Sequence, residues 1–265
     1  MSNQTTIGAI RATSDRKTRK YKTQCNTFGL LPGNDGGTCP YSTCKAGGCW
    51  HVPEGRKLPD CYVAKLMSAY GGVQPILEHN TKLLMGATEK QMTNLLRAEF
   101  RRFLAAEVKR NGSAVFKTPP LYRMHWSGDV FNAKYARAIA AAVNVYPEIN
   151  FWMYTRSFKY VPILCNIPNL ILYLSLDPVN TTLGLKTFLA NKSQTNSLGI
   201  CYMSKTNNLL EHMKTLGIEA PPELNKYLKL STCPVDTGKM ELEGGCMRCQ
   251  QCTRVLNNKS IWFKS

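Results

Sequence analysis

Two groups of cysteines constrain this chain more than any other feature of its sequence. The first group comprises Cys39, Cys44, Cys49 and Cys61, and the second comprises Cys233, Cys246, Cys249 and Cys252. The sequence has 11 cysteines in 265 residues, an odd number that a framework made only of disulfides does not use up. Grouped thiolates select zinc or iron–sulfur clusters, so we expect two metal centres.

The spacing within the second group favours an iron–sulfur cluster. Cys246, Cys249 and Cys252 form a C-x-x-C-x-x-C run, and Cys233-Pro234 supplies a remote fourth thiol. This arrangement is typical of ferredoxin-like sites, whereas zinc sites usually combine two separated C-x-x-C pairs. We therefore expect an iron–sulfur cluster near the C-terminus, with zinc as the alternative.

The spacing within the first group is less regular and leaves its ligand set open. If Cys39, Cys44 and Cys61 are ligands, Cys49 is spare; if Cys49 is a ligand, Cys44 is spare. Three thiolates on a four-iron cluster leave one iron free to bind a substrate or cofactor, as the open position of a catalytic zinc does. The number of protein ligands therefore decides whether this centre is purely structural or can bind a substrate or cofactor.

The sequence predicts a protein of the cytoplasm rather than of a membrane or an oxidising compartment. No apolar run reaches the roughly 18 residues that a membrane helix needs. The N-terminus has no apolar region of the kind found in signal peptides. In a reducing compartment thiols stay free to bind metals.

The chain is strongly basic, with a net charge of +17 from 34 Lys and Arg against 17 Asp and Glu. Such an excess favours a polyanionic partner, and nucleic acid is the first candidate. The basic residues are spread along the chain and include Arg97, Arg101, Arg102, Lys109, Arg110, Arg248, Arg254, Lys259 and Lys264. Residues 1–22 are polar and basic, and we expect a flexible arm there.

Hydrophobic patterning predicts strands that alternate with helices. We expect strands at 25–31, 121–126, 149–154, 170–176, 198–203 and 227–230, and helices from 61, at 73–85, 88–110, 132–145, 158–164, 182–190 and 207–216. Such alternation is typical of βα units and a parallel sheet. We therefore expect an α/β fold built as a closed or partly open barrel over residues 23–230, followed by a cysteine-rich extension over 231–265.

Polar residues gather where the expected strands end. They are His125, Ser127, Asp129, Thr155, Arg156, Ser157, Ser175, Asp177, Ser204 and Lys205. In parallel barrels the active site is built at the carboxyl ends of the strands. The loop from Cys39 to Cys61 follows the first expected strand, so it should reach the same rim. The alternative is that these residues are ordinary helix caps and turn residues.

The remaining histidines and cysteines carry less information. His51, His79 and His212 have no patterned partner, whereas His125 at a strand end is a candidate to face the site. We expect Cys25, Cys165 and Cys201 to be ordinary buried thiols.

Several short motifs resemble a group of bacteriophage proteins related to radical S-adenosylmethionine (SAM) enzymes. They are Thr38-Cys39-Pro40, Cys61-Tyr62-Val63-Ala64, the tract His125–Asp129, the tract Tyr154–Ser157, and Cys233-Pro234 with the closing C-x-x-C-x-x-C. The resemblance covers residues 25–252 and departs in one respect. Radical SAM proteins typically carry C-x3-C-x2-C, whereas this chain has C-x4-C-x4-C-x11-C.

The resemblance implies a partial (βα) barrel of the radical SAM type with a C-terminal cysteine-rich extension. It implies a [4Fe-4S] cluster whose open iron chelates SAM, and reductive cleavage of SAM to methionine and a 5′-deoxyadenosyl radical. In such enzymes an acidic motif holds the SAM amino group, and Asp129 stands at the matching place. By the same placement Arg156, Ser157 and Ser175 would contact the SAM carboxylate or ribose.

The substrate that the resemblance implies is a modified thymine base in phage DNA. Similar phage proteins include isomerases that convert a glycyl group joined to the thymine methyl carbon through nitrogen into a form joined through its α-carbon. The expected partners are then DNA and a reductant such as a flavodoxin or ferredoxin, in the host cytoplasm. No catalytic residue is assigned from the sequence.

Two other classes of function remain open at this point. A radical SAM enzyme acting on a protein or a small metabolite would use the same cofactor without DNA. A nucleic-acid-binding protein without enzymatic activity would carry two structural metal sites, with zinc rather than iron and no cleavage of SAM.

Overall fold

The structure is a computed structural model that describes residues 8–34, 36–46, 48–192, 195, 197–205, 207–219, 222, 225–253 and 260–264. The helices are α1 (Tyr62–Ala69), α2 (Val73–Met85), α3 (Glu89–Asn111), α4 (Ala133–Val143), α5 (Val161–Leu164), α6 (Thr181–Lys192), α7 (Leu209–Thr215), α8 (Asn225–Leu228) and α9 (Gly245–Cys249), with a 3-10 turn at Phe158–Tyr160. The strands are β1 (Leu121–Arg123), β2 (Asn150–Thr155), β3 (Leu170–Leu176), β4 (Leu198–Ser204), β5 (Ser231–Thr232) and β6 (Ile261–Lys264).

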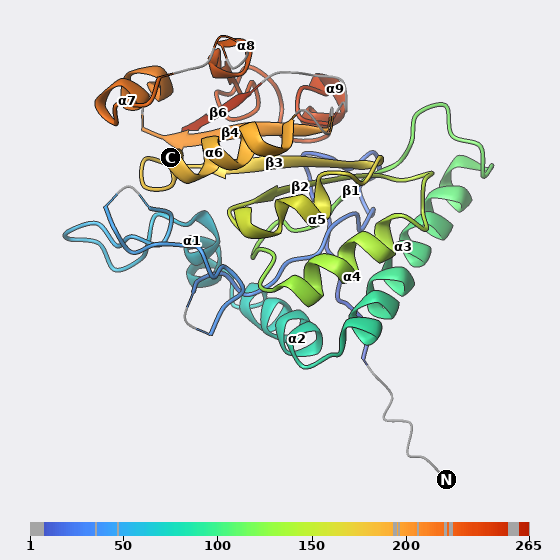
Figure 1. Ribbon diagram of the computed structural model, residues 1–265. Helices are drawn as coiled ribbons and strands as arrows, with labels where there is room; N and C mark the ends of the chain where they lie inside the picture. Colours follow the sequence, from blue (N-terminus) through green and yellow to red (C-terminus); the bar gives the residue numbers. More distant parts are fainter. Residues whose placement is uncertain are drawn as a thin grey trace.

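The strands form one parallel sheet in the order β1-β2-β3-β4-β6-β5. The sheet curls into a half-barrel, and helices connect β1 to β2, β2 to β3 and β3 to β4 (Figure 1). The expectation of an α/β fold with a partly open parallel barrel is thereby confirmed. Strand β3 is buried along its whole length, as expected for a parallel strand that is covered on both faces.

Alternation along the strands divides the interior into two apolar layers. Phe151 and Met153 of β2 join α3 and α4 in the main core. Trp152 of β2 and Tyr173 of β3 face the other way, into a smaller cluster on the inner face of the half-barrel. Because side chains of a strand alternate between its two faces, this inner face is built from every second residue. It also contains Cys201 and part of the second cysteine group.

Helix α3 begins and ends where its sequence predicts. Thr88 Oγ1 accepts a hydrogen bond from Gln91 N at 3.3 Å, and the Gln91 side chain accepts one from Thr88 N at 2.8 Å. These two bonds form a capping box. Gly112 ends the helix in the left-handed conformation with φ 70°.

The first expected strand forms an extended edge rather than a regular strand. The main chain from Asn26 to Leu30 runs beside β1, with bonds from Arg123 N to Asn26 O (2.9 Å), Trp126 N to Phe28 O (3.1 Å) and Leu30 N to Ser127 O (2.9 Å). Among the described residues, Thr27 forms an isolated parallel bridge to Arg123 of β1 and an antiparallel one to Thr13. The loop from Cys39 to Cys61 still starts from the edge of the sheet.

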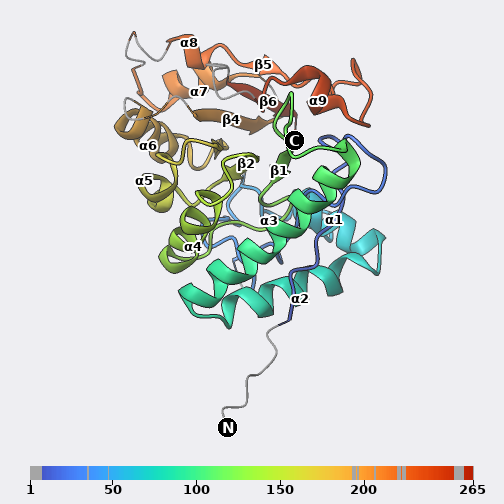
Figure 2. The ribbon, with the colours of Figure 1, turned by 90° about the vertical axis from the view of Figure 1, so that its right-hand side faces the viewer.

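The C-terminal part of the sheet differs from the expectation. A strand over 227–230 was wrong: Tyr227 and Leu228 lie in helix α8 and pack in the main core, and the strand β5 follows at Ser231–Thr232. Strand β6 was not expected, and it lies between β4 and β5 (Figure 2). The end of the chain therefore belongs to the sheet.

Residues 8–22 of the expected arm pack against the folded chain. Ile10 is buried, and its carbonyl accepts a bond from Arg102 at 2.9 Å. The carbonyls of Arg16 and Lys17 accept bonds from Gly244 N and Cys246 N, both at 2.8 Å. The N-terminal segment thus holds the short helix α9. No helix among the described residues is both long and apolar enough to cross a bilayer.

Candidate functional site

The carboxyl ends of the strands form a rim that is tied together by Asp129. Its Oδ1 atom accepts bonds from Val130 N (2.7 Å) and Thr155 Oγ1 (2.6 Å), and its Oδ2 atom accepts one from Arg156 N (2.8 Å). Burial raises the pKa of Asp129, and these donors act against that rise. A carboxylate has about four acceptor positions, and two of the three in use join the loop after β1 to the end of β2.

The Ser127-Gly128-Asp129 turn needs its glycine. Gly128 has φ 80°, a conformation that L side chains rarely adopt. A Cβ atom there would lie 2.4 Å from Thr38 Oγ1 and 2.6 Å from Leu30 Cβ. Thr38 Oγ1 also accepts a bond from Asp129 N at 3.3 Å. The close approach brings the start of the cysteine loop against the rim.

Arg156 carries a buried positive charge into the rim. Its Nη1 atom donates to Asp177, and its Nη2 atom lies 3.4 Å from Met203 Sδ. Asp177 is fixed in turn, since its Oδ1 atom accepts bonds from the backbone N–H groups of Val179 (2.9 Å) and Asn180 (3.0 Å). Burial acts to lower the pKa of Arg156, but Cys49 and Asp177 raise it overall.

The two serines expected at the site have different surroundings. Ser157 Oγ donates to Val130 O at 2.7 Å, so this buried serine holds the loop after β1. Ser175 lies on the inner face of β3, with its Oγ 3.7 Å from Met203 Sδ. Ser175 is therefore directed toward the Arg156 side of the rim.

Three of the four cysteines in the first group come together beside this rim. Burial raises the pKa of Cys39 well above its ordinary value, and the nearby charges of Asp129, Cys49 and Cys61 raise it further. Burial likewise raises the pKa of Cys49 and Cys61, and Arg156 acts against it at both.

Cys44 does not share this environment. Its side chain is exposed, and its carbonyl oxygen is 2.9 Å from His51 Nδ1. Trp50, next to Cys49, packs where a Cβ atom on Gly33 would lie. These contacts turn the loop so that Cys49 faces the rim and Cys44 faces solvent.

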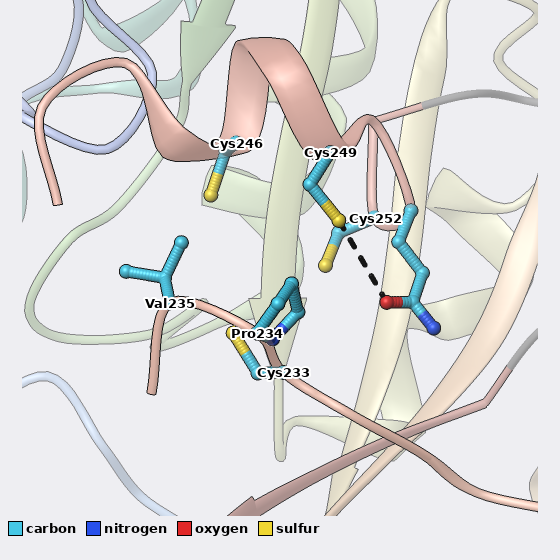
Figure 3. A pocket seen from close by; sticks show the side chains of 7 residues that line it. Cys233, Pro234, Val235, Cys246, Cys249 and Cys252 are labelled. Atoms are coloured by element: carbon cyan, nitrogen blue, oxygen red, sulfur yellow. Dashed lines mark hydrogen bonds between the residues drawn. The ribbon is translucent and has the colours of Figure 1, made fainter. Parts of the chain in front are cut away.

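The four cysteines of the second group surround a common pocket. Cys246 and Cys249 extend from α9, Cys252 follows that helix, and Cys233 lies opposite (Figure 3). The sulfur atoms point into the space between these segments. Burial and nearby Asp15 raise the pKa of Cys246 to about 12. Cys233, Cys246 and Cys252 pack on the inner face of the sheet.

Neither group meets the geometry of a single metal ion. In the described ranges, no three His, Cys, Asp or Glu side chains lie close enough together to hold one. A tetrahedral zinc with Zn–S bonds of about 2.3 Å requires sulfurs about 3.8 Å apart. Sulfurs that bind a four-iron cluster lie further apart, because each one binds a different iron. Thiolates are donors for both zinc and iron–sulfur clusters, so the side chains of each group have the chemistry for either kind of centre.

The other histidines and cysteines have structural surroundings. His125 lies in the core, with Nε2 2.8 Å from Tyr135 Oη, and burial lowers its pKa to about 3. His51, His79 and His212 each bond a main-chain carbonyl at 2.9 Å. Cys165 and Cys201 are buried as expected, but Cys25 is exposed, so that expectation was wrong.

Two residues near the site were missed from the sequence. Met203 contacts Arg156 and Ser175, and Cys201 lies in the inner cluster with the second cysteine group. The sequence could have indicated both residues, because Cys201 and Met203 are two residues apart on β4 and such residues share a face of the sheet.

Sequence comparisons place the chain in a phage protein family. The Gene product 88 family profile matches residues 3–258. The chain belongs to the Gene product 88 family. It is 28% identical to the Gene 88 protein of Mycobacterium phage L5 over 263 residues, covering 95% of this chain and 97% of that protein. It is also 28% identical to the Gene 88 protein of Mycobacterium phage D29, covering 98% and 99% of the two chains. No solved structure gives a significant match.

Proposed function

We propose that this member of the Gene product 88 family is an iron–sulfur enzyme of the radical SAM type that modifies DNA bases. The observation that carries the proposal is the grouping of Cys39, Cys49 and Cys61 beside Asp129 and Arg156 at the carboxyl rim of a half-barrel. Three thiolates leave one position of a four-iron cluster for a ligand. When bound, such a cluster with SAM supplies one-electron cleavage and a 5′-deoxyadenosyl radical.

The rim residues have the chemistry to hold the amino-acid part of SAM. Asp129 is a buried carboxylate suited to an ammonium group, and three donors already fix its orientation. A guanidinium has five N–H donors, and Arg156 uses one on Asp177 and one toward Met203. Its other donors suit a carboxylate. Ser175 is the candidate for the ribose, while Ser157 positions the loop.

The proposed substrate is a modified thymine in phage DNA. Membership in a phage family and the net charge of +17 both support a DNA partner. Exposed basic side chains are available on α3 at Arg101 and Lys109. The reaction that we propose is isomerisation of an N-linked glycyl group on thymine to the Cα-linked form, with a flavodoxin or ferredoxin as reductant.

The cofactor is tested by anaerobic purification and reconstitution with iron and sulfide. Iron and zinc contents are measured first, and 5′-deoxyadenosine is then measured by mass spectrometry after reduction with SAM. We expect a brown protein that releases 5′-deoxyadenosine. A colourless protein with stoichiometric zinc would instead identify a metal-stabilised nucleic-acid-binding protein.

Cys44 and Cys49 provide a matched pair of variants for this assay. Cys49→Ser should abolish release of 5′-deoxyadenosine, because it removes a thiolate from the rim. Cys44→Ser should retain it, because Cys44 is exposed. Equal loss in both variants would contradict the three-ligand site.

The substrate is tested separately by nucleoside analysis of DNA carrying N-linked glycylthymine. Turnover on a peptide or metabolite alone would reject the DNA substrate.

A further inference from the structure

Tyr154 lies between the inner face of the sheet and the second cysteine group. It extends from β2 and packs against the apolar cluster that contains Cys233, Cys246 and Cys252. Its ring centroid lies 5.2 Å from that of Trp152, 5.5 Å from that of Tyr173 and 5.7 Å from that of Phe263. These three rings fix the direction of the Tyr154 hydroxyl.

The Tyr154 hydroxyl is buried without a nitrogen or oxygen partner among the described residues. A buried hydroxyl without an acceptor costs free energy unless a ligand or a thiolate accepts a hydrogen bond from it. The Cys252 thiol lies beside this hydroxyl, and the two groups interact electrostatically. The nearby Tyr173 differs, because its hydroxyl is 3.4 Å from Gln251 O.

A positively charged side chain, Arg123, lies close to the Tyr154 ring. The Arg123 guanidinium lies 5.1 Å from the Trp152 ring centroid and 6.0 Å from that of Tyr154. Its Nη1 atom donates to Asp15 at 3.1 Å, while its buried Nε atom has no partner in the described part of the chain. Trp152 Nε1 is likewise buried and unpartnered there. The inner face thus offers a cation and unpaired donors beside a group of four thiolates.

We infer that the second cysteine group holds a four-iron cluster bound by four protein thiolates, and that Tyr154 tunes its reduction potential by donating to Cys252. Tyr154 is a positioning and tuning residue and not a metal ligand. A donor to a ligating sulfur stabilises the more negative, reduced cluster, so it raises the potential. Arg123 lies on the same side, but Asp15 offsets its charge, so Tyr154 is the group that we expect to set the shift.

The inference rests on the proposed iron–sulfur chemistry, but only at the second centre. It is therefore tested in the full-length chain carrying Cys39→Ala, Cys49→Ala and Cys61→Ala, which leaves the second group alone. After reconstitution, iron is quantified and the cluster is titrated electrochemically with detection by electron paramagnetic resonance. This readout does not depend on SAM or on DNA.

Tyr202→Phe is the matched control for Tyr154→Phe. Tyr202 lies in the main core on the opposite face of the sheet, so its hydroxyl does not face the second cysteine group. We expect Tyr154→Phe to disfavour reduction at least tenfold, a shift of about 59 mV to more negative potential for one electron. Tyr202→Phe should leave the potential unchanged.

Each outcome of the titration either supports or overturns the tuning role of Tyr154. Loss of iron in Tyr154→Phe but not in Tyr202→Phe also supports it, because only one hydroxyl distinguishes Tyr154→Phe from the parent chain. An unchanged potential in an iron-loaded Tyr154→Phe protein overturns the tuning role, and zinc in place of iron overturns the cluster. If the second cluster behaves as expected but the intact protein does not cleave SAM, the proposed function fails and this inference stands.

Discussion

Glu99 should make the stability of the protein fall as the pH rises from about 4.5 to about 7. This carboxyl is only 4% exposed in helix α3, and it accepts a bond from Tyr122 Oη at 3.0 Å and a further bond from Arg102. Burial raises the pKa of Glu99 from 4.5 to about 7, against the effects of Arg102 and Tyr122. The folded protein therefore binds a proton at Glu99 that the unfolded chain has already released.

The magnitude follows from the size of the shift. Each pKa unit corresponds to about 1.4 kcal/mol, so Glu99 accounts for a loss of about 3 kcal/mol of unfolding free energy. The favourable contribution is complete below pH 4.5 and is lost as the pH rises to about 7. Glu99→Gln removes this ionisation, so its stability should fall less over the same range.

Urea unfolding of the two proteins between pH 5 and pH 8, at fixed metal content, measures this difference. Tyr122→Phe is a second probe with the opposite sign. It removes a donor that lowers the pKa of Glu99, so it should steepen the loss of stability. If wild type and Glu99→Gln lose the same free energy between pH 5 and pH 8, the assignment of the proton to Glu99 is wrong.

Three further substitutions test other parts of the fold and the site. Gly128→Ala should destabilise the protein by at least about 1 kcal/mol in thermal unfolding, because of its positive φ and its close approach to Thr38; a stability equal to wild type would show that this turn is adaptable. Thr88→Ala should cost about 1 kcal/mol by the same measurement, since it removes the capping box of α3, and no loss would contradict that role. Under the proposed function, Arg156→Lys should weaken SAM binding about tenfold in equilibrium dialysis, because lysine cannot reproduce the fork that contacts Asp177; unchanged affinity would remove Arg156 from the SAM site.

Much of the central sheet could be predicted because its local pattern and its packing agree. Leu170–Leu176 is an apolar run of the length typical of a buried strand, and the structure places β3 on the same residues. Residues 227–230 alternate in a way that also suits a strand, but Tyr227 packs against Phe188 of α6, with ring centroids 5.0 Å apart, and takes part in a helix. Strand β6 depends on a partner about 60 residues earlier in the chain, which no local pattern reveals.

The candidate site shows the same division between local and long-range information. Spacing alone identified both cysteine groups, and the ends of the strands identified Asp129 and Arg156. The choice between Cys44 and Cys49 depends on how the loop turns, through the bond of His51 to the Cys44 carbonyl and the packing of Trp50. The place of Tyr154 opposite the second cysteine group depends on how the C-terminal segment folds back across the sheet.

The position of β6 also bears on how the protein is made. In the part of the chain that the structure describes, strand β5 pairs with β6 alone, and β6 consists of Ile261–Lys264. The four thiols of the second cysteine group precede β6 in the chain, so β6 cannot cover them until residues 261–264 have been synthesised. Under the proposed cluster chemistry, we therefore expect the second centre to acquire its metal only after β6 has been synthesised, and truncation before Ile261 to yield protein deficient in that metal.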